Sequence, residues 1–198
     1  MKKHSFTLIE ILIALVVFGI GILSVFVLVT NNIGLVQKVK VKTTATFLAR
    51  EGLEYAFNQR DTNLFKGVDW RCAKLDQNYN CFSYFGVGNA YRLEKTLTGN
   101  YTFITTSVDY KTNLLYFHSG TIVTPNSTFT GFWYDHNNID GQASVFSRYI
   151  YFTGAYLQGD GNVGDESLIM KVQSHVDFNK SNLAKGEVIL ESFIGQIK

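Results

Sequence analysis

Lys2-Lys3-His4-Ser5-Phe6-Thr7-Leu8-Ile9-Glu10 opens the chain and runs directly into residues 11–29, which contain no charged residue. At about 1.5 Å per residue, a helix over this run is long enough to cross a hydrocarbon core roughly 30 Å thick. A basic start followed by an apolar run is typical of a targeting segment or a membrane span. Glu10 fits neither, because a carboxylate at the edge of lipid is costly unless another group pairs with it.

The segment Ser5-Phe6-Thr7-Leu8-Ile9-Glu10 resembles the processing and methylation motif of type IV prepilins and of the pseudopilins of type II secretion. That family has a short basic leader, a small residue before the cut, Phe first in the mature chain and Glu fifth. The resemblance implies cleavage between Ser5 and Phe6 by a prepilin peptidase, N-methylation of Phe6, and a role for Glu10 in assembly. Ser5 stands where the family usually has Gly.

The resemblance also implies the fold and its location. We expect an α+β protein in which a long N-terminal helix, half transmembrane and half amphipathic, precedes an antiparallel β-sheet head. The expected segments are a cleaved leader (1–5), a transmembrane and filament-core helix (6–29), its amphipathic continuation (30–60) and an extracytoplasmic β-rich head (61–198). Lysines flank the apolar run on both sides, so the positive-inside rule alone gives no orientation. The resemblance implies a single pass through the inner (cytoplasmic) membrane with a cytoplasmic N-terminus, and then an extracellular or periplasmic filament.

Beyond residue 32 the sequence predicts an amphipathic helix. Apolar and small residues recur at helical spacing on one side: Gly34, Val41, Ala45, Leu48, Gly52 and Tyr55. Polar residues occupy the other side: Lys40, Arg50, Glu51, Glu54 and Asn58. Small residues at positions 45 and 52 suggest a sheet that presses closely on the helix, and an ordinary core helix with an incidental glycine fits them equally well.

The second half of the chain shows the two-residue alternation of β-strands. Residues 91–97 and 101–104 predict a hairpin, and residues 168–178 and 188–194 predict a pair with one buried and one wet face. Shorter strands are expected at residues 114–117, 129–134 and 145–152. Clusters of Asn, Asp and Gly favour a loop over residues 61–88, between the helix and the sheet.

Both cysteines, Cys72 and Cys81, fall within this expected loop. They are close enough in sequence to close a small ring, and an exported domain can be oxidised, so we expect a disulfide. A pair of free thiols is the alternative. The formal net charge of +2 falls to about 0 once the two leader lysines are removed, so no global field attracts nucleic acid.

The sequence contains no familiar catalytic motif. The histidines at positions 4, 118, 136 and 175 are scattered, and no GxSxG, HExxH or phosphate-loop pattern occurs. Asp135 and His136 are neighbours, but adjacent strand residues point to opposite faces, and we interpret the pair as a solvated turn. We therefore expect no enzyme.

One acidic stretch, residues 159–166, is a candidate calcium site. Asp160, Asn162, Asp165 and Glu166 supply oxygen ligands among permissive glycines, and some pseudopilins bind calcium. The spacing is not that of an EF-hand loop, and a polar turn between strands is the favoured interpretation. No cofactor is therefore expected, with calcium as the alternative.

These features together predict a structural subunit, a minor pilin or pseudopilin of a type IV pilus-like filament. Its expected partners are other pilin or pseudopilin subunits, the prepilin peptidase, the inner membrane and the pilus or secretion assembly machinery. Nucleic acid would be a partner only in a DNA-uptake pilus. Two alternatives fit the same residues: a pseudopilin of a type II secretion system, and a membrane-anchored ligand-binding module that does not polymerise.

Overall fold

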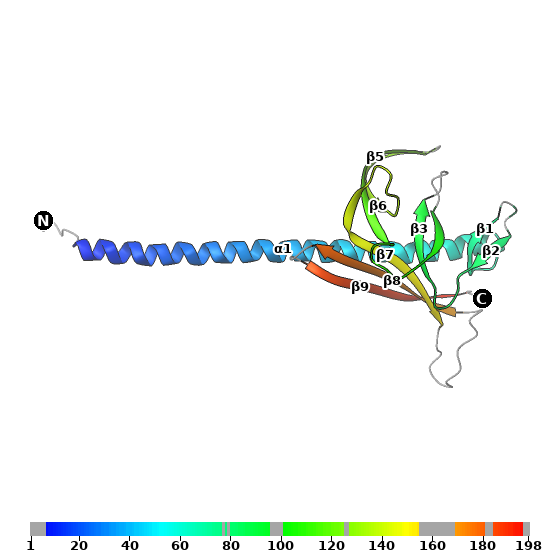
Figure 1. Ribbon diagram of the computed structural model, residues 1–198, viewed down its shortest axis with the longest axis horizontal. Helices are drawn as coiled ribbons and strands as arrows, with labels where there is room; N and C mark the ends of the chain where they lie inside the picture. Colours follow the sequence, from blue (N-terminus) through cyan, green and yellow to red (C-terminus); the bar gives the residue numbers. More distant parts are fainter. Residues whose placement is uncertain are drawn as a thin grey trace, which may run out of the picture. The chain divides into compact units, whose positions relative to one another are not determined.

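The computed structural model describes residues 7–76, 78, 80–95, 101–124, 127–154, 169–180 and 184–195. The chain divides into two compact units, Met1–Val41 and Lys42–Lys198. Within the described ranges one helix comes first and every later element is a strand (Figure 1). The fold class is therefore α+β with a pilin-like layout, as the sequence predicts.

Helix α1 (Leu8–Phe65) contributes residues to both units. It ends where Gly67 takes a left-handed φ of 69°, a conformation that glycine adopts without steric cost. The Gly67 amide donates to the Leu64 carbonyl at 3.1 Å, and the Val68 amide donates to the Asn63 carbonyl at 2.9 Å. These two bonds make a Schellman motif, which satisfies carbonyls that the helix end would otherwise leave open.

The strands of the second unit form a small hairpin and a larger antiparallel sheet. Their bounds are β1 (Cys72–Leu75), β2 (Cys81–Tyr84), β3 (Ala90–Lys95), β4 (Tyr101–Thr106), β5 (Leu114–Thr124), β6 (Ser127–Asp135), β7 (Gln142–Gly154), β8 (Ile169–Lys180) and β9 (Ala184–Gly195). The hairpin is β1–β2, and all the others belong to the large sheet.

Strand β7 is the branch point of the large sheet. Along one edge it pairs with β8, which in turn pairs with β9 over the whole length of both strands. Along its other edge β7 pairs first with β5 and later with β3, so the hairpins β5–β6 and β3–β4 diverge from it. Strands β4 and β9 therefore lie at opposite edges of the sheet, and residues 42–65 of α1 lie beside β7 and β8 (Figure 1).

An aromatic cluster fills the core between the sheet and the end of α1. Phe85 stacks on Phe152 with ring centroids 4.3 Å apart, and it meets Tyr91 and Phe103 edge-on. Every second residue of β8 from Met170 to Phe178 is buried, as strand alternation requires, and Met170 and Val172 belong to this core. Burial of its large side chains stabilises the head.

Residues 42–65 of α1 pack closely on this sheet at Gly52. A Cβ atom built at Gly52 would overlap Ser174 Oγ and would lie 3.2 Å from Ser174 Cβ and 3.4 Å from Arg148 Cδ. Ala45 and Leu48 are buried on the same side of the helix. Of the two alternatives that the sequence leaves open, the structure has the close helix–sheet contact, at Gly52.

The strand predictions are confirmed, whereas the expected loop at residues 61–88 is only partly correct. β3 pairs with β4, and β8 pairs with β9, as the alternation indicates. The predicted segments of β5, β6 and β7 are shorter than the strands themselves. Within the expected loop, however, α1 continues to Phe65 and the hairpin β1–β2 follows.

Candidate functional site

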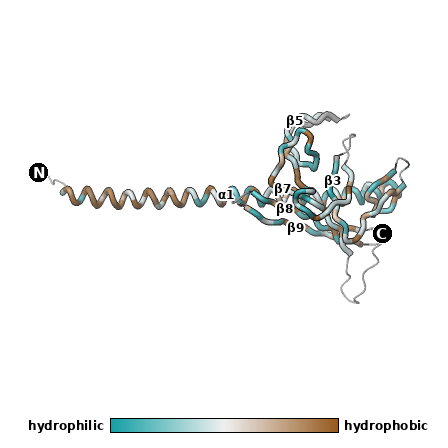
Figure 2. The backbone as a smooth tube through the Cα atoms, in the orientation of Figure 1, coloured by the Kyte–Doolittle hydropathy of each residue, from teal (hydrophilic) through white to brown (hydrophobic). Residues whose placement is uncertain are grey.

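The unit Met1–Val41 exposes an apolar helix surface. Large hydrophobic side chains of α1 are open to the surroundings at every turn from Leu8 to Val29; Leu8, for example, is 80% exposed. Figure 2 shows this part of α1 as almost uniformly hydrophobic. Among the described residues, α1 is the one helix long and apolar enough to cross a membrane, and its most apolar stretch is nowhere buried within the chain. Such a surface needs lipid or other apolar helices around it.

Two hydroxyl groups in this apolar stretch are satisfied within the helix itself. Ser24 Oγ donates to the Ile20 carbonyl at 2.9 Å, and Thr30 Oγ1 donates to the Val27 carbonyl at 2.9 Å. Back-bonding of this kind removes the cost of placing a hydroxyl in lipid. These two hydroxyl side chains are therefore compatible with a membrane span.

Glu10 lies in the first turn of α1, where the helix dipole favours a carboxylate. The backbone amides of Glu10 and Ile11 donate to the Thr7 carbonyl at 3.1 and 3.3 Å, which closes that turn. The Glu10 side chain is exposed, and no group of the described chain pairs with it. Ser5 and Phe6, the expected processing residues, lie outside the described residues.

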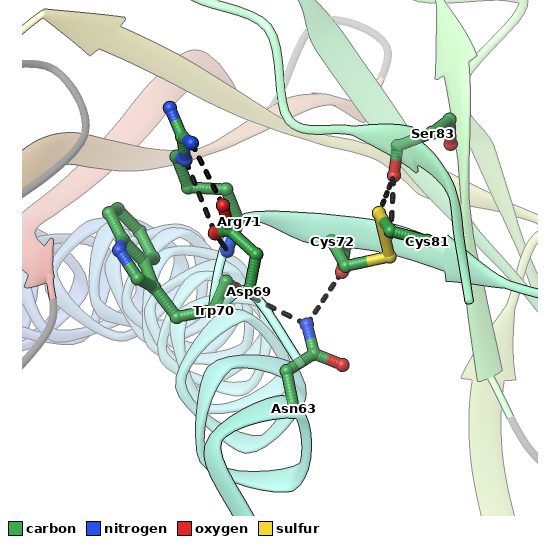
Figure 3. Close-up of polar contacts among 7 residues, drawn as sticks. All are labelled: Asn63, Asp69, Trp70, Arg71, Cys72, Cys81 and Ser83. Carbon is green, nitrogen blue, oxygen red and sulfur yellow. Dashed lines mark hydrogen bonds and ion pairs between the residues drawn. A yellow bond between two sulfur atoms is a disulfide. The ribbon is translucent and has the colours of Figure 1, made fainter. Parts of the chain in front are cut away.

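The predicted disulfide is present in the structure. Cys72 and Cys81 are bonded, with their Cα atoms 5.6 Å apart, and they join β1 to β2 (Figure 3). Asn63 of α1, fully buried, donates to the carbonyls of Trp70 and Cys72 at 3.2 and 2.7 Å. The disulfide and Asn63 together tie the short hairpin to the end of the helix.

The calcium candidates Asp160, Asn162, Asp165 and Glu166 lie outside the described residues. Within the described part of the chain, no group of three or more His, Cys, Asp or Glu side chains is placed to hold a metal ion. The described residues thus offer no support for a calcium site.

The interpretation of Asp135-His136 as a solvated turn is wrong. Asp135 is 3% exposed, and its carboxylate accepts from His118 Nε2 at 2.9 Å. His136 Nδ1 lies 2.8 Å from the Leu93 carbonyl and its Nε2 lies 2.9 Å from the Arg148 carbonyl. The ring fills the gap where β3 has separated from β7, so it bridges the two branches of the sheet.

Sequence analysis also missed an ion pair between the sheet and the helix, in which Arg148 is buried and the Glu51 side chain is partly exposed. Arg148, 1% exposed, donates to the Glu51 carboxylate at 2.6 Å and to the Leu48 carbonyl at 3.2 Å. Glu51 was expected on the wet side of the helix, but it lies at the margin of the contact. The helix and the sheet approach closely at Gly52, and this brings the Arg148 guanidinium within reach of the Glu51 carboxylate and the Leu48 carbonyl oxygen.

His136 provides a pH-dependent contribution to the stability of the head. Burial, and next the positive charges of Arg148 and Arg92, lower its pKa from 6.5 to about 4. The folded protein therefore binds fewer protons than the unfolded chain between these values, and folding stability is lost as the pH falls from about 6.5 to 4. The loss from this one group is expected to reach about 3 kcal/mol.

The measurement is chemical denaturation of the full chain in detergent at several pH values between 6.5 and 4. His136→Gln retains a hydrogen-bonding group but does not titrate, so its stability is expected to change less steeply with pH than that of the parent. Other groups titrate in both proteins and cancel in the comparison. Equal slopes in parent and variant would contradict the assignment.

An exposed apolar helix with a carboxylate in its first turn, joined to an antiparallel β head, has the layout of pilin-like proteins. Residues 1–26 match the family model described as the prokaryotic N-terminal methylation motif, which is the signature of type IV pilins and pseudopilins. No curated protein matches the chain, and no solved structure does. The match spans the start of the chain and does not include the head.

Proposed function

We propose that this protein is a structural subunit of a type IV pilus-like filament, processed by a prepilin peptidase and assembled through its N-terminal helix. The observation that most supports this proposal is the methylation motif at residues 1–26, which overlaps the exposed apolar part of α1. We infer a minor pilin or pseudopilin rather than an enzyme. In this proposal the subunit is a substrate of the prepilin peptidase, which cleaves it between Ser5 and Phe6.

The structure of each unit supports this proposal physically. An apolar helix that nothing in the chain covers is stable first in the membrane and then in a bundle of like helices. The Cys72–Cys81 disulfide is compatible with a head that matures in an oxidising compartment outside the cytoplasm. We therefore propose a cytoplasmic N-terminus and an extracytoplasmic head before assembly.

The proposal predicts a mature chain that begins with N-methylated Phe6. The leader is short and basic, and the fifth residue after the cut is Glu10, which is the register that the motif requires. The protein should be recovered from sheared surface fibres and from membranes, and its N-terminus determined by mass spectrometry. Ser5→Gly should be processed at least as well as the parent.

Two results would contradict the proposal. A chain that still contains Lys2 and Lys3 in both fractions would exclude processing. A correctly processed chain that never enters fibres, and that never cross-links to pilin neighbours, would leave a membrane-anchored protein and exclude the filament role.

A further inference from the structure

The hairpin β5–β6 extends beyond the strand that joins it to the rest of the large sheet. Strand β5 pairs with β7 only from Leu114 to Phe117, whereas it pairs with β6 along the whole hairpin. Among the described strands, β6 pairs with β5 alone, so its other edge is open (Figure 1). Thr121 and Thr130 are exposed there, and Phe132 is 72% exposed. Beyond Phe117 the hairpin is therefore a two-stranded ribbon with an open edge on β6.

This ribbon lacks the features that normally keep an edge strand from pairing with another chain. Proteins protect such edges with charged side chains or with bulges. Residues 114–134 contain no Lys, Arg, Asp or Glu, although 17% of the whole chain is charged. The register between β5 and β6 runs without a shift, whereas the register between β5 and β7 has one. The β6 edge is therefore protected neither by charge nor by an irregular register.

The other two edge strands of the large sheet differ from β6. Strand β9 pairs with β8 alone, and three charged side chains lie along it: Lys185, Glu187 and Glu191. Strand β4, at the opposite edge, also contacts β1 of the small hairpin. Among the described edges of the sheet, β6 is thus the one best suited to pair with another chain.

The backbone and the aromatic side chains of the ribbon both favour a further strand at this edge. A two-stranded hairpin alone is at most marginally stable in water, and three or more strands are usually needed. Phe132 stacks on Phe117 with ring centroids 5.6 Å apart, and Phe117 lies next to Tyr134 at 5.4 Å. Phe132, at the outer end of this row, remains mostly exposed. An added strand would pair the open backbone groups of β6 and cover the Phe132 ring.

We propose that the β6 edge pairs in antiparallel fashion with β6 of a second copy of this chain. An identical strand is favoured because self-pairing brings each side chain near its own copy, and a strand without charge suffers no repulsion there. With the two-fold axis at Gly131, Thr130 of each copy lies opposite Phe132 of the other, on the same face. The contact belongs to the head and is separate from the proposed assembly through the N-terminal helix.

The test is the oligomeric state of the full chain in a non-ionic detergent, measured by light scattering over a range of protein concentrations. The parent should form a dimer. Thr130→Lys should weaken dimerisation by about tenfold or more, because a lysine on an edge strand opposes pairing. Thr105→Lys is the matched control, since it places the same charge at an exposed threonine of the edge strand β4. It should leave dimerisation within about twofold of the parent.

Cross-linking reports the contact itself. Cys72 and Cys81 are bonded to each other and the chain has no other cysteine, so Thr130→Cys introduces a single reactive thiol. A short bismaleimide should link Thr130→Cys into a covalent dimer and leave Thr105→Cys monomeric, and thermal unfolding curves check that each head is folded. A monomeric parent would overturn the proposal and leave the β6 edge to a strand of a different protein. Equal effects at positions 130 and 105 would also overturn it, because the N-terminal helix would then be what drives dimerisation.

Discussion

Gly52→Leu is expected to lower the thermal unfolding midpoint of the head by roughly 6 to 12 °C, a loss of about 3 kcal/mol. In an exposed helix, replacement of glycine by leucine would stabilise the fold, because glycine is a poor helix former. At position 52 the same substitution is expected to destabilise the fold instead. The new Cβ would lie 3.2 Å from Ser174 Cβ, and the rest of the side chain would have to displace β8 or Arg148.

The displacement would also weaken the ion pair that depends on this close approach. If α1 moves away from the sheet, Arg148 loses its bonds to Glu51 and to the Leu48 carbonyl. The loss of this ion pair would add to the steric cost of the substitution. Circular dichroism of the full chain in detergent, followed at strand wavelengths, measures the midpoint.

Gly34→Leu is the matched control on the same helix. A Cβ atom at Gly34 would meet nothing within 4 Å, so the substitution has no steric cost within the chain. It should leave the midpoint of the head unchanged or slightly raised. If the two substitutions had the same effect, the close contact at Gly52 would not be what requires glycine there.

The contact at Gly52 could be predicted as one of two alternatives because it follows from local spacing. Ala45, Leu48 and Gly52 fall on one helix face, and the alternation in residues 168–178 identifies a strand with one buried face. Both patterns are properties of short segments. The sequence therefore predicts the helix and the paired strands β8 and β9, and it leaves a close contact between helix and sheet as one of two alternatives.

The sequence predicts too early an end for α1, because the true end depends on contacts between residues that are not neighbours in the sequence. Asn and Asp around residues 61–63 are weak helix formers and indicate a loop. Asn63 is nevertheless helical, and its amide bonds the carbonyls of Trp70 and Cys72. Gly67 then ends the helix. Tertiary hydrogen bonds have overridden local propensity, and the short strands β1 and β2 depend on the same contacts.

The contacts of Arg148 and His136 cannot be predicted from local sequence either, because their partners are far away in the chain. Arg148 meets Glu51 across 97 residues, and His136 meets the Leu93 carbonyl across 43. The rule that adjacent strand residues point to opposite faces does not extend to His136, because β6 ends at Asp135. Local sequence could not show that Asp135 meets His118 or that His136 lies against two strand carbonyls.

Glu10→Ala is expected to leave membrane insertion and cleavage largely intact and to reduce filament incorporation by about a hundredfold or more. In our proposal the carboxylate lies among packed apolar helices once the filament has formed. A charge there is costly unless an opposite charge meets it. In the same proposal, cleavage would create that charge, the amine of Phe6, and methylation would leave it cationic. The resemblance of residues 5–10 to the prepilin motif implies that the partner of Glu10 is the amine of a neighbouring subunit, and we propose that pairing.

The magnitude follows from leaving one member of a buried pair without the other, which costs roughly 3 to 5 kcal/mol. Glu10→Asp should be intermediate, because it is shorter by one methylene. Glu54→Ala is the matched control: Glu54 pairs with Arg50 on the surface, where both side chains are more than half exposed and the pair contributes about 1 kcal/mol or less. The measured quantity is the ratio of filament-borne to membrane-held mature protein in cells that also express wild-type partners. If Glu10→Ala entered fibres as readily as Glu54→Ala, the apolar helix alone would drive assembly, and the proposed charge pairing would be wrong.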